Sequence, residues 1–154
     1  MLMKNAILLT LIVTSFSGFA AAESLVPGST EAVAFVGGSD GHGTIGAGLA
    51  KAINTRWLAI GELAYVNSRA VEFGGNAHYL FPIKNPKFTP YALVGLGVFH
   101  SSAGRGSTSF GANIGGGARW QTGDNWGVRP ELKIFVGDGS YARFTIGLYY
   151  KFGR

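Results

Sequence analysis

The sequence of 154 residues contains no cysteine and few charged side chains. Without cysteine, neither a disulfide framework nor a thiolate metal site can form. Asp, Glu, Lys and Arg make up 14% of the residues, whereas ordinary soluble domains contain about 25%. So little charge is unusual for a protein whose whole outer surface faces water.

Long hydrophobic runs are also missing beyond the N-terminal segment. A transmembrane helix needs about 20 consecutive apolar residues, and no later part of the sequence supplies them. Only helices and closed barrels satisfy every backbone hydrogen bond in lipid. If the protein lies in a membrane, it must therefore cross it with strands.

The charges that are present leave a net charge of +5. Nucleic acid is the obvious partner of a basic chain. The basic residues, however, are scattered at about one per strand or turn and do not gather on one face. We therefore expect no nucleic-acid partner.

The N-terminal segment has the order of regions found in a secretory signal peptide. Lys4 precedes an apolar run, Ala6 to Val13, and small residues follow as far as Ala22. Ala20 and Ala22 fit the A-x-A cleavage pattern, which predicts a signal peptide at 1–22 and a barrel domain at 23–154. The alternative is a membrane anchor, for which the apolar run is short.

Beyond residue 29, runs of alternating apolar and polar residues recur between short turn signals, the pattern of an all-β barrel or sandwich. The even number of runs favours an eight-stranded antiparallel up-and-down barrel. The faces of the first and third runs are ambiguous, Pro130 interrupts the seventh, and Ser101–Ser109 is the longest expected loop. The predicted strands are Glu31–Gly38, Thr44–Ile53, Trp57–Val66, Ala70–Phe81, Phe88–His100, Phe110–Gln121, Trp126–Val136 and Tyr141–Phe152.

The last run has one face without a polar residue, formed by Ala142, Phe144, Ile146, Leu148, Tyr150 and Phe152. A transmembrane strand needs about 9–11 residues, so this run is long enough to cross a bilayer. Thr145, Gly147, Tyr150 and Phe152 resemble the C-terminal signature of bacterial outer-membrane β-barrels. The resemblance implies that the barrel assembly machinery reads this strand. Gly153 and Arg154 depart from it, because the signature usually ends on the aromatic residue.

Alternation alone does not say which face lies outside. A soluble, lipocalin-like barrel buries its apolar face, and a membrane barrel exposes it. The polar faces here carry little charge and much glycine, which suits the narrow lumen of a small barrel. An aromatic belt at strand ends also favours the membrane barrel. Its predicted members are Trp57, Tyr79, Phe81, Trp120, Trp126, Tyr150 and Phe152.

In a membrane barrel most of the strand charges point into the lumen, where they can pair across it. We interpret them as a packed ionic core, because a conduction path needs a wider barrel, of about sixteen strands in large porins. The residues predicted to point mostly inward are Glu62, Glu72, Arg119, Arg129, Glu131, Lys133, Arg143 and Lys151.

Three further segments resemble the OmpA-like outer-membrane β-barrel family: Asn76–Pro82, Thr89–Tyr91 with Gly95–Gly97, and Arg129–Leu132. The resemblance implies an eight-stranded barrel in the outer membrane of a Gram-negative bacterium, with both termini in the periplasm. It also implies a non-enzymatic structural or surface-interaction role. The expected partners are outer-membrane lipid and lipopolysaccharide, and we expect a monomer.

One alternative makes the protein an enzyme. His100 and Ser102 lie two residues apart on one strand face, and the pair faintly resembles outer-membrane lipid A deacylases, in which a carboxylate orients the histidine. Here no Asp or Glu occurs between Ala103 and Gln121. We therefore predict no catalytic residues, and lipid A hydrolysis stays the alternative. His42 and His78 are too dispersed to predict a metal site, and we expect no cofactor.

Overall fold

The computed structural model describes residues 24–67, 70–85, 87–102, 106–137 and 139–152. The predicted signal peptide and the Gly153–Arg154 tail lie outside these residues. The part of the chain that is described contains no helix long and apolar enough to cross a membrane.

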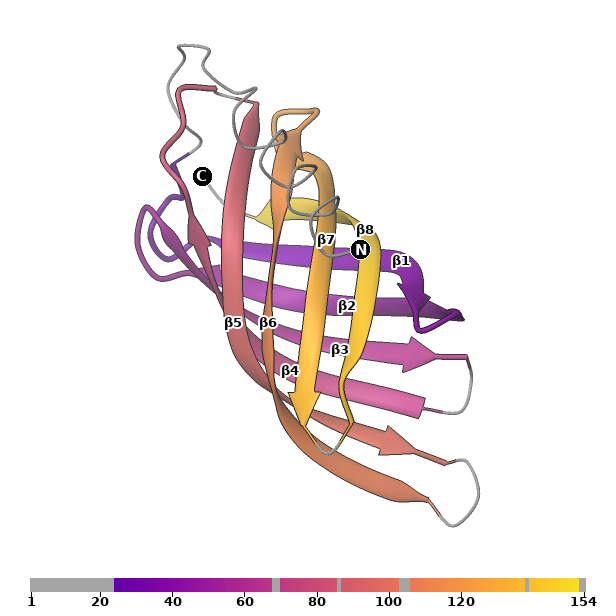
Figure 1. Ribbon diagram of the computed structural model, residues 1–154. Coiled ribbons are helices and arrows are strands. Elements are labelled where there is room, and N and C mark those ends of the chain that lie inside the picture. The colour runs from indigo at the N-terminus through magenta and orange to yellow at the C-terminus, as the bar shows by residue number, and fades with distance from the viewer. Residues whose placement is uncertain (1–23, 68–69, 86, 103–105, 138, 153–154) are drawn as a thin grey trace, which may run out of the picture.

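The described residues form eight antiparallel strands that close into a barrel, each strand pairing with its sequence neighbours and β8 returning to β1 (Figure 1). The predicted all-β, eight-stranded barrel is confirmed. The strands are β1 Thr30–Ser39, β2 His42–Ala52, β3 Trp57–Val66, β4 Ala70–Leu80, β5 Phe88–Ser101, β6 Ser107–Gln121, β7 Trp126–Gly137 and β8 Tyr141–Phe152.

The connections alternate between the two ends of the barrel. The end that carries Thr30 and Phe152 also carries the described connecting residues 53–56, 81–85, 87 and 122–125, and we call it the turn end. The opposite end carries the described connecting residues 40–41, 67, 102, 106 and 139–140, and we call it the loop end. β1 and β8 pair along their length from Thr30 with Phe152 to Ser39 with Arg143.

The longest expected loop, Ser101–Ser109, is shorter than the sequence suggested. β6 begins at Ser107, and Ser101 pairs with Ser107 at the tip of the hairpin. His100 and Thr108 face each other across it, with His100 Nδ1 2.8 Å from the Thr108 hydroxyl oxygen. The Ser- and Gly-rich composition predicted a loop, whereas this side-chain contact accompanies continued pairing of the strands.

Pro130 does lie inside β7, opposite Ile146 of β8. On its other side the β6–β7 pairing is interrupted: it runs as far as Gly117 with Glu131 and resumes at Trp120 with Val128 in the same register. A proline has no N–H to donate to the ladder, so an interruption is expected here. The break lies near the turn end, and the strand continues through it.

The structure shows which side chains of β1 and β3 point inward, a question that the sequence left open. In β1 the buried side chains include Glu31, Val33 and Phe35, and in β3 they include Ile60 and Glu62. Both faces of β1 are largely apolar, so polarity could not distinguish them. Trp57, Leu63 and Tyr65 consequently lie on the outside.

Glycines on the inner face make room for the large side chains that fill the lumen. A Cβ at Gly117 would meet the Pro130 carbonyl oxygen and the Tyr91 hydroxyl, and one at Gly127 would meet the hydroxyl of Tyr149. These neighbours leave no space for a side chain. Large side chains therefore fill the lumen, as expected of an eight-stranded barrel.

Candidate functional site

Inside the barrel, buried acidic and basic side chains are equal in number, so their formal charges cancel. Each of them is 1–2% exposed. The acids lie on β1, β3, β4 and β7, and the bases lie on β6, β7 and β8, so most pairs join the two halves of the barrel across the lumen. The residues are Glu31, Glu62, Glu72 and Glu131 with Arg119, Arg129, Lys133 and Arg143.

Glu62 is the central acceptor of this network. Arg129 Nη2 lies 3.1 Å from its Oε1, and Arg143 Nη2 lies 3.0 Å from its Oε2. The ammonium group of Lys133 also contacts Oε2. Because the even-numbered residues of β3 point inward, Glu62 reaches cations from two strands on the far side of the barrel.

The other carboxylates lie on either side of Glu62. Toward the loop end, Glu72 Oε2 accepts hydrogen bonds from Arg143 and from the Tyr141 hydroxyl, both at 2.9 Å. At the turn end, Arg119 holds Glu31 with two hydrogen bonds of 3.0 and 2.8 Å. Paired guanidinium–carboxylate bonds of this kind fix orientation as well as charge.

Glu131 links the ionic network to two aromatic rings. The Tyr91 hydroxyl donates to its Oε2 at 2.7 Å, and Arg129 Nη2 lies 3.4 Å from the same oxygen. The His78 ring stacks on Tyr91 with 4.7 Å between ring centroids. The lumen is thus a packed polar core.

The predicted inward charges are confirmed as buried, apart from Lys151, which is half-buried near the turn end with its ammonium 3.1 Å from Gln121 Oε1. Sequence reasoning missed Glu31 and Tyr91. Glu31 was missed because both faces of β1 are largely apolar, so alternation did not mark its side as the inner one. Nothing local in the sequence indicated that Tyr91 would reach Glu131, which lies 40 residues away.

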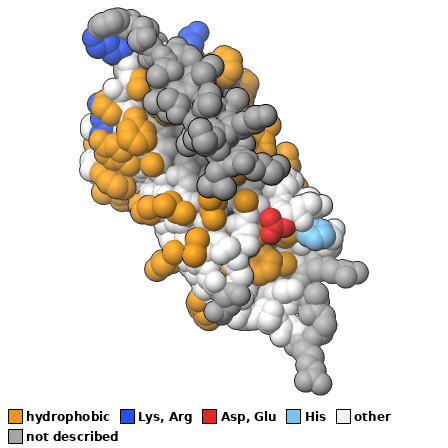
Figure 2. Space-filling view, viewed as in Figure 1, with side chains coloured by type: hydrophobic (Ala, Val, Ile, Leu, Met, Phe, Trp, Pro, Cys, Tyr) orange, Lys and Arg blue, Asp and Glu red, His pale blue; other side chains and the backbone are white. Residues whose placement is uncertain are grey.

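The outer wall of the barrel is apolar. Figure 2 shows hydrophobic side chains spread over the visible face, with Lys and Arg at one end and acidic and His side chains at the other. Leu96 and Phe110, with exposed fractions of 73% and 70%, point straight out of the sheet. Each outward set alternates with the buried set along its strand, as the period of two requires.

The predicted aromatic belt is present at the turn end. Trp57 packs on Tyr79 with ring centroids 5.1 Å apart, and Tyr79 meets the edge of Phe81 at 5.4 Å. Tyr150 and Phe152 form a similar pair at 5.1 Å. Trp120 and Trp126 are exposed on the wall of the same end.

The structure does not support the catalytic alternative at His100 and Ser102. His100 points outward, and its Nδ1 forms a hydrogen bond with the Thr108 hydroxyl. Ser102 lies exposed just beyond the end of β5. Among the described residues, no carboxylate forms a hydrogen bond or ion pair with His100. A histidine without an orienting acid lacks the third member of a triad.

The other two histidines lie far apart. His42, at the loop end, has its Nδ1 3.3 Å from Asn67 Nδ2, and His78 is buried in the lumen. In the described part of the chain, no three His, Cys, Asp or Glu side chains gather as a metal ion would require.

Comparison with known proteins gives matches to solved structures alone: no protein-family model and no curated protein sequence matches the chain. The N-terminal β-barrel domain of Pseudomonas aeruginosa OprF superposes with a TM-score of 0.73 at 18% identity, covering 82% of this chain and 98% of that one.

Two further structures are also similar. A de novo designed transmembrane β-barrel has a TM-score of 0.65 at 20% identity, with coverage of 84% and 99%. Yersinia pestis Ail, the attachment invasion locus protein, in complex with the heparin analogue sucrose octasulfate, has a TM-score of 0.57 at 16% identity, with coverage of 82% and 100%. The fold is therefore that of the small outer-membrane β-barrels, as the sequence predicted.

The central position of Glu62 in the ion-pair network predicts that removing its charge destabilises the barrel strongly. Glu62→Gln should lower the free energy of unfolding by about 3–5 kcal/mol, because three buried cations lose their shared carboxylate. Urea unfolding of the barrel in lipid vesicles, followed by tryptophan fluorescence, measures the change. Asp124→Asn, in an exposed turn, is the control and should change it by less than about 0.5 kcal/mol. Equal midpoints for the two variants would contradict the assignment of Glu62 as the central acceptor.

Proposed function

We propose that this protein is a non-enzymatic integral protein of the bacterial outer membrane, with a structural or surface-interaction role. The observation that carries the proposal is the distribution of polarity: apolar side chains cover the outer wall, and paired charges fill the lumen. The fold shared with OprF and Ail agrees with it.

The energetics of the wall favour lipid over water. Burying apolar surface contributes about 25 cal/mol per Å², and side chains such as Leu96, Phe110 and Phe73 remain more than half exposed in the barrel. In a soluble barrel these side chains would be the core and the charges would face solvent. Here the arrangement is reversed, which the aromatic belt at the turn end reinforces.

The orientation follows from the two ends. The first and last strands begin and end at the same end of the barrel, and the resemblance to the OmpA-like family implies that both termini lie in the periplasm. The turn end, with Thr30 and Phe152, would then lie at the periplasmic side, and the loop end at the cell surface. Outer-membrane lipid and lipopolysaccharide would surround the wall, with the protein acting as a monomer.

The location is tested with fluorophores attached to single cysteines, which the cysteine-free chain allows. A lipid-borne quencher should quench a label at Leu96→Cys, in the middle of the outer wall, and spare one at Asp124→Cys, in a turn. Aqueous iodide should give the reverse order. Iodide quenching at both positions, without lipid quenching at position 96, would refute the membrane location.

Export is proposed to proceed through removal of residues 1–22. Protein isolated from membranes should begin at Glu23 by N-terminal sequencing. Ala20→Asp should block cleavage because position 20 must be small in the A-x-A pattern, whereas Ala21→Asp should be tolerated. Retention of Met1 in the unaltered protein would rule out the cleavage.

Recognition by the barrel assembly machinery is proposed to rest on Thr145, Gly147, Tyr150 and Phe152 in β8. Phe152→Ala should slow assembly into vesicles that contain the purified machinery, while Phe110→Ala, an outward phenylalanine of β6, should not. Spontaneous folding into thin-bilayer vesicles reports general damage and should be similar for both. Equal assembly rates for the two variants would count against recognition through Phe152.

A further inference from the structure

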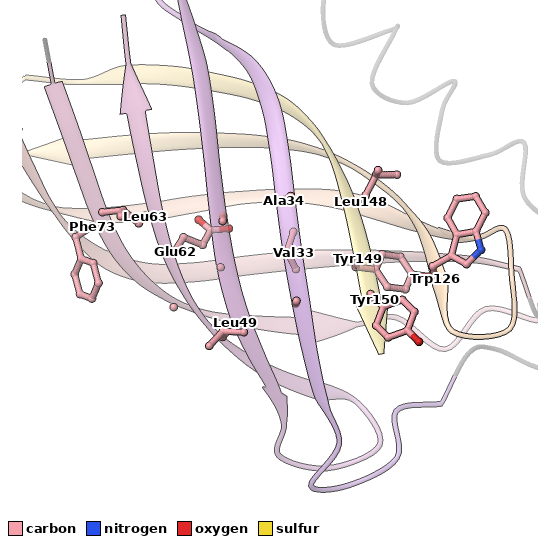
Figure 3. A pocket seen from close by; sticks show the side chains of 14 residues that line it. Val33, Ala34, Leu49, Glu62, Leu63, Phe73, Trp126, Leu148, Tyr149 and Tyr150 are labelled. Atoms are coloured by element: carbon pink, nitrogen blue, oxygen red, sulfur yellow. The ribbon is translucent and has the colours of Figure 1, made fainter. Parts of the chain in front are cut away.

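The outer wall over β1–β3 is hollowed where small residues meet. Ala34 of β1 pairs with Ala47 of β2, and Leu49 pairs with Gly61 of β3. The hollow has a volume of about 950 Å³. Its sides are higher than its floor: Leu63 and Phe73 rise on one side, and Leu148, Tyr150 and Trp126 rise on the other (Figure 3).

A second hollow of about 520 Å³ adjoins the first and shares Leu49 and Gly61 with it. Lys51, exposed on the outer face of β2, lies at its rim. The partners of Lys51 across the two neighbouring strands are Thr30 and Ala59, both too short to cover the ammonium group. Together the two hollows extend over an apolar floor toward the ammonium group of Lys51, near the turn end.

Lys51 has no acidic partner within the described part of the barrel. Four of the described acids are buried in the lumen. The other two are Asp40, at the loop end, and Asp124, in the turn between β6 and β7. A lysine on an apolar wall near the membrane interface needs an anion or water for its ammonium group. The surrounding lipid can supply that anion as a phosphate.

We propose that the two hollows bind one anionic glycerophospholipid, with its phosphate on Lys51 and its acyl chains over Ala47 and Gly61. The proposal rests on the membrane location proposed above. It goes beyond that location because it assigns one wall of the barrel, rather than the whole circumference, a preference among lipids. Flexible chains fit the Ala- and Gly-floored depressions, and the cation selects a negatively charged head group.

A second copy of the barrel is the competing occupant. Around a two-fold axis the same patch faces itself, so a dimer centred on the hollows would bring the two Lys51 ammonium groups toward each other. No described carboxylate of this wall is available to compensate. Charge therefore favours lipid over a second copy.

The test uses Trp126, which borders the first hollow, as the sole tryptophan after Trp57→Phe and Trp120→Phe. The barrel is folded into phosphatidylcholine vesicles that contain a minor fraction of chain-brominated lipid. Brominated phosphatidylglycerol should occupy the site about fivefold more than brominated phosphatidylcholine at the same fraction, the ratio for one lysine beside an anionic head group, about 1 kcal/mol. Stronger quenching of Trp126 reports that occupancy.

Two substitutions and their matched controls separate charge from shape. Lys51→Gln should remove the preference, whereas Lys87→Gln, in a turn of the same end, should keep it. Ala47→Leu, which fills the floor, should reduce quenching by the anionic lipid, whereas Ala112→Leu on the outer face of β6 should not. A heat-modifiability gel confirms that each variant is folded.

Failure of the lipid-site proposal can be distinguished from failure of the proposed membrane location. Equal quenching by the two brominated lipids, or a preference that survives Lys51→Gln, overturns the lipid site while the membrane location stands. Shielding of Trp126 from both lipids, with the label at position 96 still quenched, assigns the hollows to a second copy and overturns the proposal. Loss of lipid quenching at both positions refutes the membrane location itself.

Discussion

Closure of β8 against β1 is the contact on which the rest of the barrel depends. The two strands pair from Thr30 with Phe152 to Ser39 with Arg143, so neither is left with an open edge. In a strand, a slip of one residue moves every side chain to the opposite face. Such a slip in β8 would place Arg143 on the apolar wall and Phe144 among the lumen charges. Closure in this register therefore sets both the lumen network and the outer surface.

The sequence predicts those features of the barrel that depend on residues close together in the chain. The faces of β2 and of β4 to β8 follow from local alternation, and the predicted bounds Trp57–Val66 and Tyr141–Phe152 coincide with β3 and β8. β1 and β3 were not assigned faces, because apolar residues occur on both sides of β1 and alternation in β3 depends on a single charge, Glu62. The neighbours in the sheet supply the missing constraint.

The ion pairs themselves were beyond sequence reasoning. Glu31 and Arg119 are 88 positions apart, and which cation meets which carboxylate depends on the tilt and stagger of all eight strands. Sequence reasoning could predict that both signs point inward, but not that Glu62 collects three cations. The His100 and Ser102 pair shows the opposite error: a suggestive local spacing whose decisive partner, a carboxylate, would have to come from elsewhere in the fold.

The closed fold alone does not specify a function, because designed barrels share it. A further property of this chain is the location of its net charge. The lumen acids and bases cancel, so the net positive charge of the described barrel comes from its turn end, where Lys51, Arg56, Lys84 and Lys87 lie outside the lumen. Of these, Lys51 projects from a strand onto the apolar wall rather than from a turn. Over β1–β3 the outer wall therefore combines hollows with an exposed cation. We propose that this part of the wall discriminates among the surrounding lipids.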